Sequence, residues 1–412
     1  MLMTTRINAV FWLIWLLLLI FCYFNSYDDP SSIFYDASRA YEQRFSRMRA
    51  TEADKYLQHL PTKPSPAGPG NELLCIGIPS INRTTESFLY YTIATLTDTL
   101  TPDERAAIYI IVLLADKSPK SHFAYGQPWL ENIADEVLVY NDAPADSHVY
   151  RTIPFDLHDG HKRGDGRVEN MRLDHSALLE SCWKRESPYF ALVEDDIVAS
   201  RDWFTRFKKG VAHVEKQAKT TGKDWIYLRL FYSEIFMGWN SEEWLMYSEA
   251  IFLVYAVVLL TFLAVRTRFR RGPVGIPASV SAQASRHMAA LVFGLWMPAM
   301  IVLYFLSGRV SVNRLNPFAS SSQGVREMPR YGCCAQGLVF PRRHLEPIQA
   351  LLRDPPYDFA GDQMLEGFAD GRGLAKWALD PSVFQHVGFK ESSAGPRTAE
   401  VWNFSFERQQ PK

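Results

Sequence analysis

The sequence has almost no net charge, because 44 Lys and Arg side chains are balanced by 45 Asp and Glu for a formal charge of -1. This balance argues against nucleic-acid binding through a broad basic face, so no nucleic-acid partner is expected. No internal repeat is present. A length of 412 residues is long enough for two or three ordinary domains.

Long hydrophobic runs, in contrast, are present at residues 9–24, 247–265 and 288–306, each close to the ~20 residues that span a bilayer as a helix. The first run lacks a small-x-small cleavage site, which argues against a cleaved signal peptide and favours a signal anchor. A buried core helix is the alternative for the second run, where Ser248 and Glu249 lie near its start. We expect a multi-pass membrane protein in contact with lipid.

Acidic residues are missing between the second and third runs. Arginines are frequent there, at positions Arg266, Arg268, Arg270, Arg271 and Arg286. The positive-inside rule therefore predicts a cytosolic loop over residues 266–286 and a cytosolic tail over residues 1–8. Residues 25–246 and 307–412 would then be lumenal.

Two further signals fit a lumenal soluble part. Glycosylation acceptor sequons begin at Asn82 and Asn403. Four of the five cysteines fall in the predicted lumenal parts, namely Cys75, Cys182, Cys333 and Cys334. Four cysteines allow three pairings, and the sequence does not choose among them, so disulfides and free buried thiols both remain open.

The lumenal residues divide by composition. Residues 61–70 are too rich in Pro and Gly for a helix or strand, which predicts a stem and linker over residues 25–70. Apolar strand patterns then alternate with helix patterns up to about residue 230, which predicts an α/β fold with a mostly parallel sheet. We expect residues 71–246 to form the first part of one domain and residues 307–412 to complete it.

The most informative stretch is residues 189–197, an apolar run that ends in Glu194-Asp195-Asp196. Carboxylates at the end of a buried strand need a cation nearby. Hard divalent cations bind carboxylates together with substrate phosphates, beyond the carboxyl ends of strands in α/β sheets. The pattern predicts a metal–diphosphate site and hence a nucleotide-sugar transferase. The alternative is that the acids cap a helix or face solvent.

These residues also carry a family resemblance. Glu194-Asp195-Asp196 resembles the DXD-type motif of GT-A glycosyltransferases, and residues 381–388 resemble the C-terminal segment of the N-acetylglucosaminyltransferase IV family. A transferase of that relation, split by a transmembrane hairpin after an N-terminal anchor, resembles the post-GPI-attachment GalNAc transferases of the Golgi.

The resemblance implies a GT-A (Rossmann-like) domain interrupted by the hairpin, in a Golgi membrane protein whose catalytic domain is lumenal. It implies UDP-GalNAc as donor and Mn²⁺ or Mg²⁺ as metal. It also implies the core mannose of a GPI glycolipid or a GPI-anchored protein as acceptor. An N-glycan branching GlcNAc transferase of the same fold and a non-enzymatic membrane scaffold are the alternative functions.

By the same resemblance, Asp196 and His386 would bind the metal, with Asp195 as a further ligand. Glu194 and Asp195 would also position the ribose or the metal-bound waters. Independently of the family, a lone His is more often a structural residue. The residues expected along the nucleotide pocket are Pro79, Ser80, Arg83, Asp116 and Lys390. An ordinary turn is the alternative for Pro79 and Ser80, and a solvated side chain for Lys390.

The family product is a β-linked sugar made from an α-linked donor, so the reaction inverts the anomeric centre and needs a base. Asp362 is the predicted base because it follows Gly361 and precedes a helix start, whose amides favour the ionised form. Helix capping is its alternative role. Asp224 is the weaker rival base.

Acceptor recognition is expected from aromatic and polar side chains near the second hydrophobic run and near the base. The candidates are Tyr232, Trp239 and Gln363. Aromatic faces stack on sugar rings, and they also gather at membrane interfaces, which is the simpler explanation for Trp239.

Overall fold

The structure is a computed structural model. It describes residues 2–40, 43–60, 68–83, 86–141, 143–144, 147–156, 162–233, 238–270, 278–315, 324–328, 332, 335–388, 391–392, 395–396 and 407. The chain forms two compact units. Unit 1 comprises Met1–Ala40 and Glu234–Ser320, and unit 2 comprises Tyr41–Ser233 and Ser321–Lys412.

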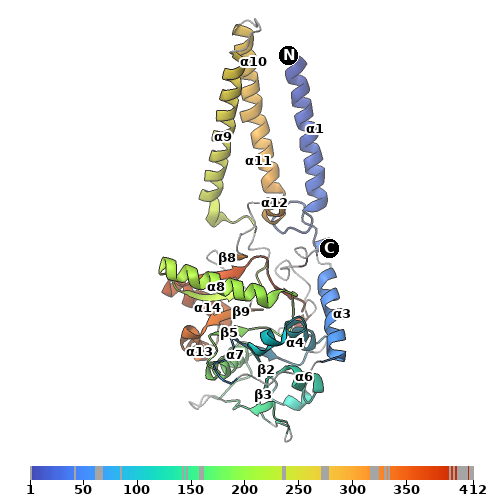
Figure 1. The fold of residues 1–412 in the computed structure, drawn as a ribbon, viewed down its shortest axis with the longest axis vertical. Coiled ribbons are helices and arrows are strands. Elements are labelled where there is room, and N and C mark those ends of the chain that lie inside the picture. The colour runs from blue at the N-terminus through green and yellow to red at the C-terminus, as the bar shows by residue number, and fades with distance from the viewer. Residues whose placement is uncertain are drawn as a thin grey trace. The chain divides into compact units, whose positions relative to one another are not determined.

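Unit 1 contains long apolar helices that run side by side (Figure 1). They are α1 (Leu2–Asn25), α9 (Trp244–Arg270), and α10 (Ala278–Leu291), which continues through the π-helical turn η4 (Val292–Trp296) into α11 (Met297–Leu306). Within the described residues, three spans are long and apolar enough to cross a membrane, Thr4–Asn25, Ser241–Arg268 and Gln283–Leu306. The predicted multi-pass architecture is confirmed, with one span near the N-terminus.

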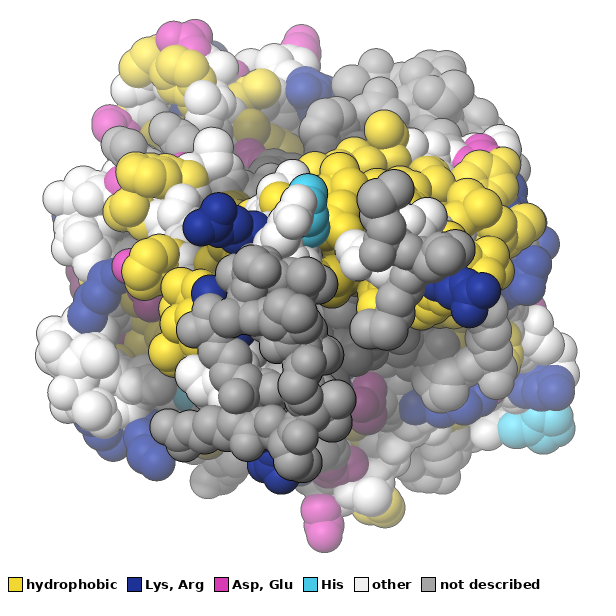
Figure 2. All heavy atoms as spheres, turned by 90° about the horizontal axis from the view of Figure 1, so that it is seen from above, with side chains coloured by type: hydrophobic (Ala, Val, Ile, Leu, Met, Phe, Trp, Pro, Cys, Tyr) yellow, Lys and Arg dark blue, Asp and Glu magenta, His cyan; other side chains and the backbone are white. Residues whose placement is uncertain are grey.

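Polar contacts join the anchor helix to the hairpin inside unit 1. Trp296 Nε1 donates to Asn8 Oδ1 over 2.9 Å, and Trp15 Nε1 donates to the Ala299 carbonyl over 3.0 Å. Most large apolar side chains of the three spans remain exposed. Figure 2 shows hydrophobic side chains gathered on the surface with Lys and Arg side chains beside them. This exposed apolar surface is what a helix facing lipid requires.

The connections of unit 1 are short elements, α2 (Ala37–Ala40), η3 (Ser241–Glu243) and α12 (Arg309–Leu315). Buried Asp29, just after α1, accepts hydrogen bonds from the Ser31 amide over 2.9 Å and from the Ser311 amide over 2.7 Å. It therefore ties the end of the anchor helix to the first turn of α12.

Unit 2 is built on a nine-stranded sheet of order β4-β3-β2-β1-β5-β9-β7-β10-β8. Its strands are β1 (Leu74–Ser80), β2 (Ile108–Leu114), β3 (Glu136–Val139), β4 (Tyr150–Thr152), β5 (Tyr189–Leu192), β7 (Trp225–Arg229), β8 (Val325–Glu327), β9 (Leu338–Pro341) and β10 (Ala375–Leu379). The continuous apolar runs of β1 and β2 are buried, as expected for central parallel strands.

Strands that precede the membrane hairpin in the sequence and strands that follow it share this sheet. β9 pairs antiparallel with β5 on one side and β7 on the other, and β10 pairs parallel with β7. β8 is an antiparallel edge strand on β10. Residues after the hairpin therefore supply three strands to the sheet that the first part begins. The predicted fold class, a mostly parallel α/β sheet interrupted by membrane helices, is confirmed.

Helices pack against the sheet of unit 2. α7 contacts β1, β2 and β5, while α8 contacts β7, β8 and β10. The helical segments of this unit are α3 (Arg44–Gln58), α4 (Leu89–Thr97), α5 (Pro102–Ala106), η1 (Pro119–Ser121), α6 (Pro128–Ile133), α7 (Arg167–Lys184), α8 (Trp203–Thr221), η5 (Arg342–His344), α13 (Leu345–Arg353) and α14 (Gly361–Arg372). Local signals set their ends, such as the Thr101–Glu104 capping box of α5 and Gly222, at φ +71°, after α8.

Two short antiparallel ribbons accompany the sheet. β6 (Ile197–Ala199) pairs with β11 (Phe384–His386), with Ile197 opposite His386. The second ribbon joins β12 (Glu391–Ser392) to β13 (Gly395–Pro396). The first ribbon brings a C-terminal segment to the end of the acidic stretch, which makes it the element that assembles the site.

A disulfide joins Cys75 in β1 to Cys182 in α7, with the two Cα atoms 5.7 Å apart. This answers one of the pairings that the sequence left open. Cys333 and Cys334 lie outside the described residues, and Cys22 in α1 is a free thiol. A disulfide persists in an oxidising compartment and stabilises the fold by restricting the unfolded chain.

Candidate functional site

The acidic triplet lies in the turn between β5 and β6. The predicted strand over residues 189–197 is shorter than expected, because β5 ends at Leu192 and pairing resumes at Ile197. Asp195 and Asp196 are buried, while Glu194 is partly exposed. The carboxylates therefore lie just beyond the carboxyl end of a central strand, where α/β sheets bind ligands.

His386 reaches this turn through the β6–β11 ribbon. Its Nε2 lies 3.0 Å from Asp196 Oδ2. One ligand atom each from Glu194, Asp196 and His386 lie within 4.8 Å of one another. The structure thus brings together a triplet and a histidine that are 190 positions apart in the sequence.

The backbone after His386 approaches Asp196 closely. The Val387 amide donates to the Asp196 carbonyl over 2.9 Å. A Cβ atom on Gly388 would lie 2.1 Å from Asp196 Oδ2, well inside van der Waals contact. Gly388 is therefore required by space, and any larger residue would displace the carboxylate or the segment.

Arg83 neutralises part of the acidic charge. Its guanidinium contacts Asp195 at 2.5 Å and Asp196 at 3.0 Å. Burial alone would lower the pKa of Arg83, but the charges of the two carboxylates outweigh burial and raise it. The arginine is held charged against the turn.

Burial, then the charges of Asp196 and Asp195, raise the pKa of Glu194 to about 8. Arg83 opposes this shift, and Asp362 adds to it. The charges of Asp195 and Asp196 therefore repel that of Glu194 even with Arg83 present. A divalent cation would relieve that repulsion.

Asp195 is fixed by a hydrogen-bond relay. Ser80, at the end of β1, donates from Oγ to Asp195 Oδ2 over 2.7 Å, and His122 Nε2 lies 3.2 Å from the same Oγ. His122 Nδ1 accepts from the Ala124 amide over 3.1 Å, so in the neutral ring the proton is on Nε2 and points to Ser80. Burial lowers the pKa of His122 to about 4, which keeps it neutral.

Thr92 of α4 holds the backbone on both sides of Asp196. Its hydroxyl lies 2.8 Å from the Asp195 and Ile197 carbonyls, and it accepts from the Ile197 amide over 3.2 Å. Sequence reasoning missed Thr92, His122 and Gly388. Only Gly388 carried a sequence signal, its place two residues after the predicted histidine ligand.

Asp362 lies close to the end of β5, from which the acidic turn continues. It lines a small cavity with His175 and Leu192, the last residue of β5. α14 begins at Gly361, earlier than the sequence predicts, and its N-cap residue is Ala360. Asp362 therefore lies in the first turn of the helix instead of at the cap.

Asp224, the rival base, precedes β7 and so lies at the amino end of a strand parallel to β5. The site lies at the carboxyl ends. Asp224 is bound instead by Arg343 at 2.5 Å and by His344 Nε2 at 3.0 Å. The structure places it at the opposite edge of the sheet, away from the candidate site.

The predicted nucleotide residues that the structure describes cluster at the ends of β1 and β2. Pro79 and Ser80 close β1, and Asp116 follows β2. The Asn82 amide donates to Asp116 Oδ2 over 3.2 Å, which links the two ends. Burial raises the pKa of Asp116. Lys390 lies outside the described residues.

The predicted acceptor residues are divided between the two units, with Tyr232 and Gln363 in unit 2 and Trp239 in unit 1. Tyr232 is buried, with 1% of its surface exposed, so its ring offers no open stacking face. Trp239 belongs to unit 1, where its Nε1 donates to the Phe305 carbonyl over 2.8 Å. Gln363 is exposed in the first turn of α14, beside Asp362.

Of the two predicted glycosylation sites, Asn403 lies outside the described residues. Asn82 is exposed, and its Nδ2 donates to the Ser121 carbonyl over 3.1 Å. A glycan on this nitrogen would replace that hydrogen bond at the rim of the candidate site.

Residues 74–385 match the model of the GPI-N-acetylgalactosamine transferase PGAP4 family. The match covers more than half of the chain, from β1 to β11. The chain belongs to this family. No curated protein was found to match it. Membership makes the protein a glycosyltransferase, and it implies transfer of GalNAc to GPI. The three candidate membrane spans found among the described residues make it a membrane protein. The resemblance noted from the sequence is therefore confirmed.

Proposed function

We propose that the protein transfers GalNAc from UDP-GalNAc, with inversion, to the core mannose of the GPI anchor on GPI-anchored proteins. One observation carries the proposal within the family: Glu194, Asp196 and His386 converge at the carboxyl end of β5. Donor, linkage stereochemistry and acceptor go beyond the family match, and they rest on the chemistry of the residues around this point.

The convergent donor set fits a divalent metal. Carboxylates suit Mg²⁺ and Mn²⁺, and an imidazole is accepted more readily by the borderline ion Mn²⁺. Asp196, His386 and Asp195 or Glu194 would hold it. When bound, the ion stabilises negative charge developing on the departing UDP. The positive charge of Arg83, which Asp195 and Asp196 hold in place, would stabilise the same negative charge on UDP.

Asp362 is the proposed base. A new bond forms between the acceptor hydroxyl oxygen and the anomeric carbon as the bond from that carbon to UDP breaks, and the hydroxyl proton passes to the Asp362 carboxylate. It lies in the first turn of α14, on the element that follows the loop after α13. General-base catalysis of this kind contributes roughly 10² to 10⁴ in rate.

The nucleotide would lie over the ends of β1 and β2. Pro79 and Ser80 shape the turn there, Asp116 faces the ribose or base, and Lys390 would meet the diphosphate. The Ser80–Asp195 hydrogen bond supports this placement, because it joins the proposed nucleotide pocket directly to the acidic turn. For the acceptor, Gln363 remains the proposed contact because it is exposed next to Asp362.

A Golgi membrane location, with unit 2 in the lumen, is part of the proposal. The Cys75–Cys182 disulfide supports an oxidising compartment. The arginines of residues 266–286 support a cytosolic loop. A glycosylation acceptor sequence placed between residues 271 and 286 should stay unmodified, and its modification would contradict this topology.

The experiment is a donor assay with purified full-length protein and a GPI-anchored acceptor. UDP-GalNAc and UDP-GlcNAc are compared with and without Mn²⁺. We expect Mn²⁺-dependent transfer from UDP-GalNAc that yields a β-linked product. Preference for UDP-GlcNAc would indicate the branching-transferase alternative, and absence of both transfer and UDP-sugar hydrolysis would indicate a scaffold.

A further inference from the structure

Helix α3 (Arg44–Gln58) belongs to the segment that the sequence predicts as a stem, and it lies outside the family match that begins at residue 74. The structure nevertheless packs α3 against α4 (Figure 1). Arg49 on this helix has 0% of its surface exposed. Complete burial of a guanidinium is costly unless each of its donors finds an acceptor, so its contacts define a specific docked position.

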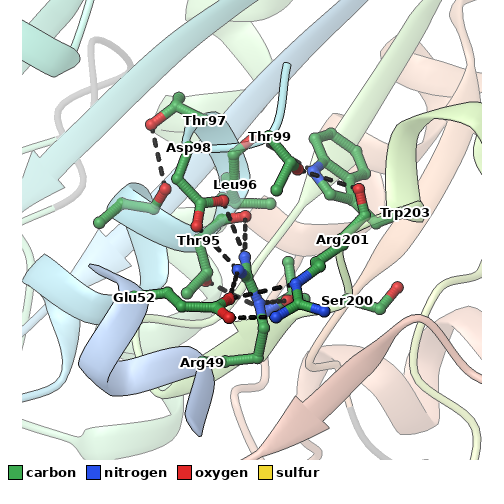
Figure 3. A network of polar contacts seen from close by, with 12 residues as sticks. Arg49, Glu52, Thr95, Leu96, Thr97, Asp98, Thr99, Ser200, Arg201 and Trp203 are labelled. Atoms are coloured by element: carbon green, nitrogen blue, oxygen red, sulfur yellow. Dashed lines mark hydrogen bonds and ion pairs between the residues drawn. The ribbon is translucent and has the colours of Figure 1, made fainter. Parts of the chain in front are cut away.

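Arg49 is bonded to the C-terminal end of α4. Its two terminal nitrogens each contact Asp98 at 2.8 Å, a bidentate pair, and Nη2 also donates to the Thr95 carbonyl over 3.3 Å. Glu52, one turn further along α3, contacts Nη1 at 2.5 Å and also pairs with Arg201. Figure 3 shows these side chains converging on the Arg49 guanidinium.

The remaining donor of Arg49 reaches the metal-site ribbon. Nε donates to the carbonyl of Ala199 in β6 over 3.0 Å, and the Ala199 amide donates to Thr95 Oγ1 over 3.1 Å. Ala199 pairs with Phe384 of β11, two positions from the Ile197–His386 pair. One buried guanidinium thus fixes α4 and β6 together, and β6 starts immediately after Asp196.

The first turn of α3 is also fixed to the C-terminal end of the chain. The Glu407 carboxylate accepts from the Phe45 and Ser46 amides, each over 2.9 Å, and so caps the helix. Glu407 lies beyond the family match as well. Residues inside the family match and a residue beyond its end therefore both hold α3 in place.

We propose that Arg49 is a positioning residue for the candidate metal site, so that α3 is a working part of the catalytic unit and not a spacer. It acts by setting the β6–β11 ribbon on which the Asp196–His386 distance depends. The inference rests on the proposed metal site. Residues that orient metal ligands typically change metal affinity by 10- to 100-fold when replaced.

The test uses the full chain with Arg49→Met, which keeps most of the side-chain length and removes the donors. Arg105→Met is the matched control. Arg105 is also largely buried, contacts both oxygens of Asp135 at 2.9 and 3.0 Å, and donates to the Ile108 and Ile133 carbonyls. Among the described residues, the hydrogen bonds of Arg105 involve neither β6 nor β11. Mn²⁺ binding is measured directly by electron paramagnetic resonance of free Mn²⁺, together with thermal unfolding.

We expect Arg49→Met to weaken Mn²⁺ binding by about 10-fold or more, and Arg105→Met to bind Mn²⁺ as the wild type does. Hydrogen exchange gives a second readout without metal. The amides of Ile197 and Ala199 should exchange faster in Arg49→Met and unchanged in Arg105→Met.

Arg49→Met leaves Asp98 buried without its partner, so the variant could fail to fold for that reason. The double variant Arg49→Met/Asp98→Met removes both charges, and Arg49→Lys keeps one charge with fewer donors. We expect the double variant to fold and still bind Mn²⁺ weakly, with Arg49→Lys intermediate. A folded double variant that binds Mn²⁺ as tightly as the wild type would overturn the proposal for Arg49 but leave the proposed metal site standing. A wild-type protein that does not bind Mn²⁺ would overturn the proposed metal site itself.

Discussion

Acidic side chains at two places in unit 2 differ in how their charge is balanced. Before β3, Asp135 accepts two hydrogen bonds from Arg105 and one from the Ile110 amide. After β5, three consecutive acids crowd one turn, with Arg83 bound to two of them. The first arrangement is a matched pair that fastens α5 to the sheet.

The acidic turn is different because its charge is not matched. Burial, then the charges of Asp196 and Asp195, raise the pKa of Glu194 even though Arg83 lies beside the turn. Acids with shifted pKa values, gathered at the carboxyl ends of strands, are typical of a site that binds a cationic ligand. The comparison teaches that burial of one acid does not indicate a functional site, whereas several acids crowded around one arginine at the carboxyl ends of strands make a candidate.

The largest effect should separate the two groups of acids. Asp196→Ala should lower transfer by at least roughly 10²-fold while the protein stays folded, because it removes a proposed metal ligand. Asp135→Ala should instead destabilise unit 2 by about 3–5 kcal/mol, because Arg105 loses its partner, with the activity of the folded fraction kept. A UDP-release assay and thermal unfolding measure both. A well-folded, fully active Asp196→Ala protein would contradict the metal-site account.

The second effect concerns the base. Asp362→Asn should lower kcat by roughly 10²- to 10⁴-fold with donor binding kept, since the amide cannot take the proton. Asp358→Asn, an exposed position before α14, is the control and should be neutral. Single-turnover kinetics measure the chemical step, and UDP-binding measurements report donor binding separately. Near-normal turnover of Asp362→Asn would move the base to another residue.

A third, smaller effect comes from space at the site. Gly388→Ala places a Cβ against Asp196 Oδ2 and should weaken Mn²⁺ binding by about 10-fold. Gly371→Ala, in α14 with no atom within 4 Å of the new Cβ, should leave binding unchanged and stabilise the helix by about 0.5–1 kcal/mol. Equal Mn²⁺ affinity in both variants would show that the close approach at Gly388 does not matter.

The smallest expected effect is a pH dependence of the stability, caused by His122. His122 has a folded-state pKa of about 4, below its unfolded value of 6.5, so the unfolded chain binds the extra proton first as pH falls. Its contribution to stability is full above pH 6.5 and is lost towards pH 4, about 2 kcal/mol between pH 8 and pH 5. His122→Gln should remove this share of the acid sensitivity, and exposed His59→Gln should not. Thermal unfolding at both pH values decides the point.

The features predicted correctly from the sequence are those that local residue patterns control. Hydrophobic length gave the membrane spans, and apolar strand runs alternating with helix signals gave the α/β sheet. Boundaries were less accurate where charge interrupted a pattern. The predicted strand continued through Glu194, Asp195 and Asp196, but β5 ends at Leu192 and the three acids lie in the turn that follows.

Contacts between distant segments were beyond local pattern. The insertion of β9 between β5 and β7 depends on pairing across the membrane hairpin. Arg49 and His122 act through tertiary hydrogen bonds that leave no spacing in the sequence. His386 was predicted because a family resemblance supplied its place, and Asp362 because a loop precedes a helix there.

Direct Mn²⁺ binding to the purified full chain tests the central claim, that segments on both sides of the membrane hairpin form one metal site. The account predicts one Mn²⁺ per chain in the wild type, and a loss of affinity of at least 10-fold in both Asp196→Ala and His386→Ala. Unchanged Mn²⁺ binding in His386→Ala, with Asp196→Ala impaired, would contradict the convergence of the two segments on the ion.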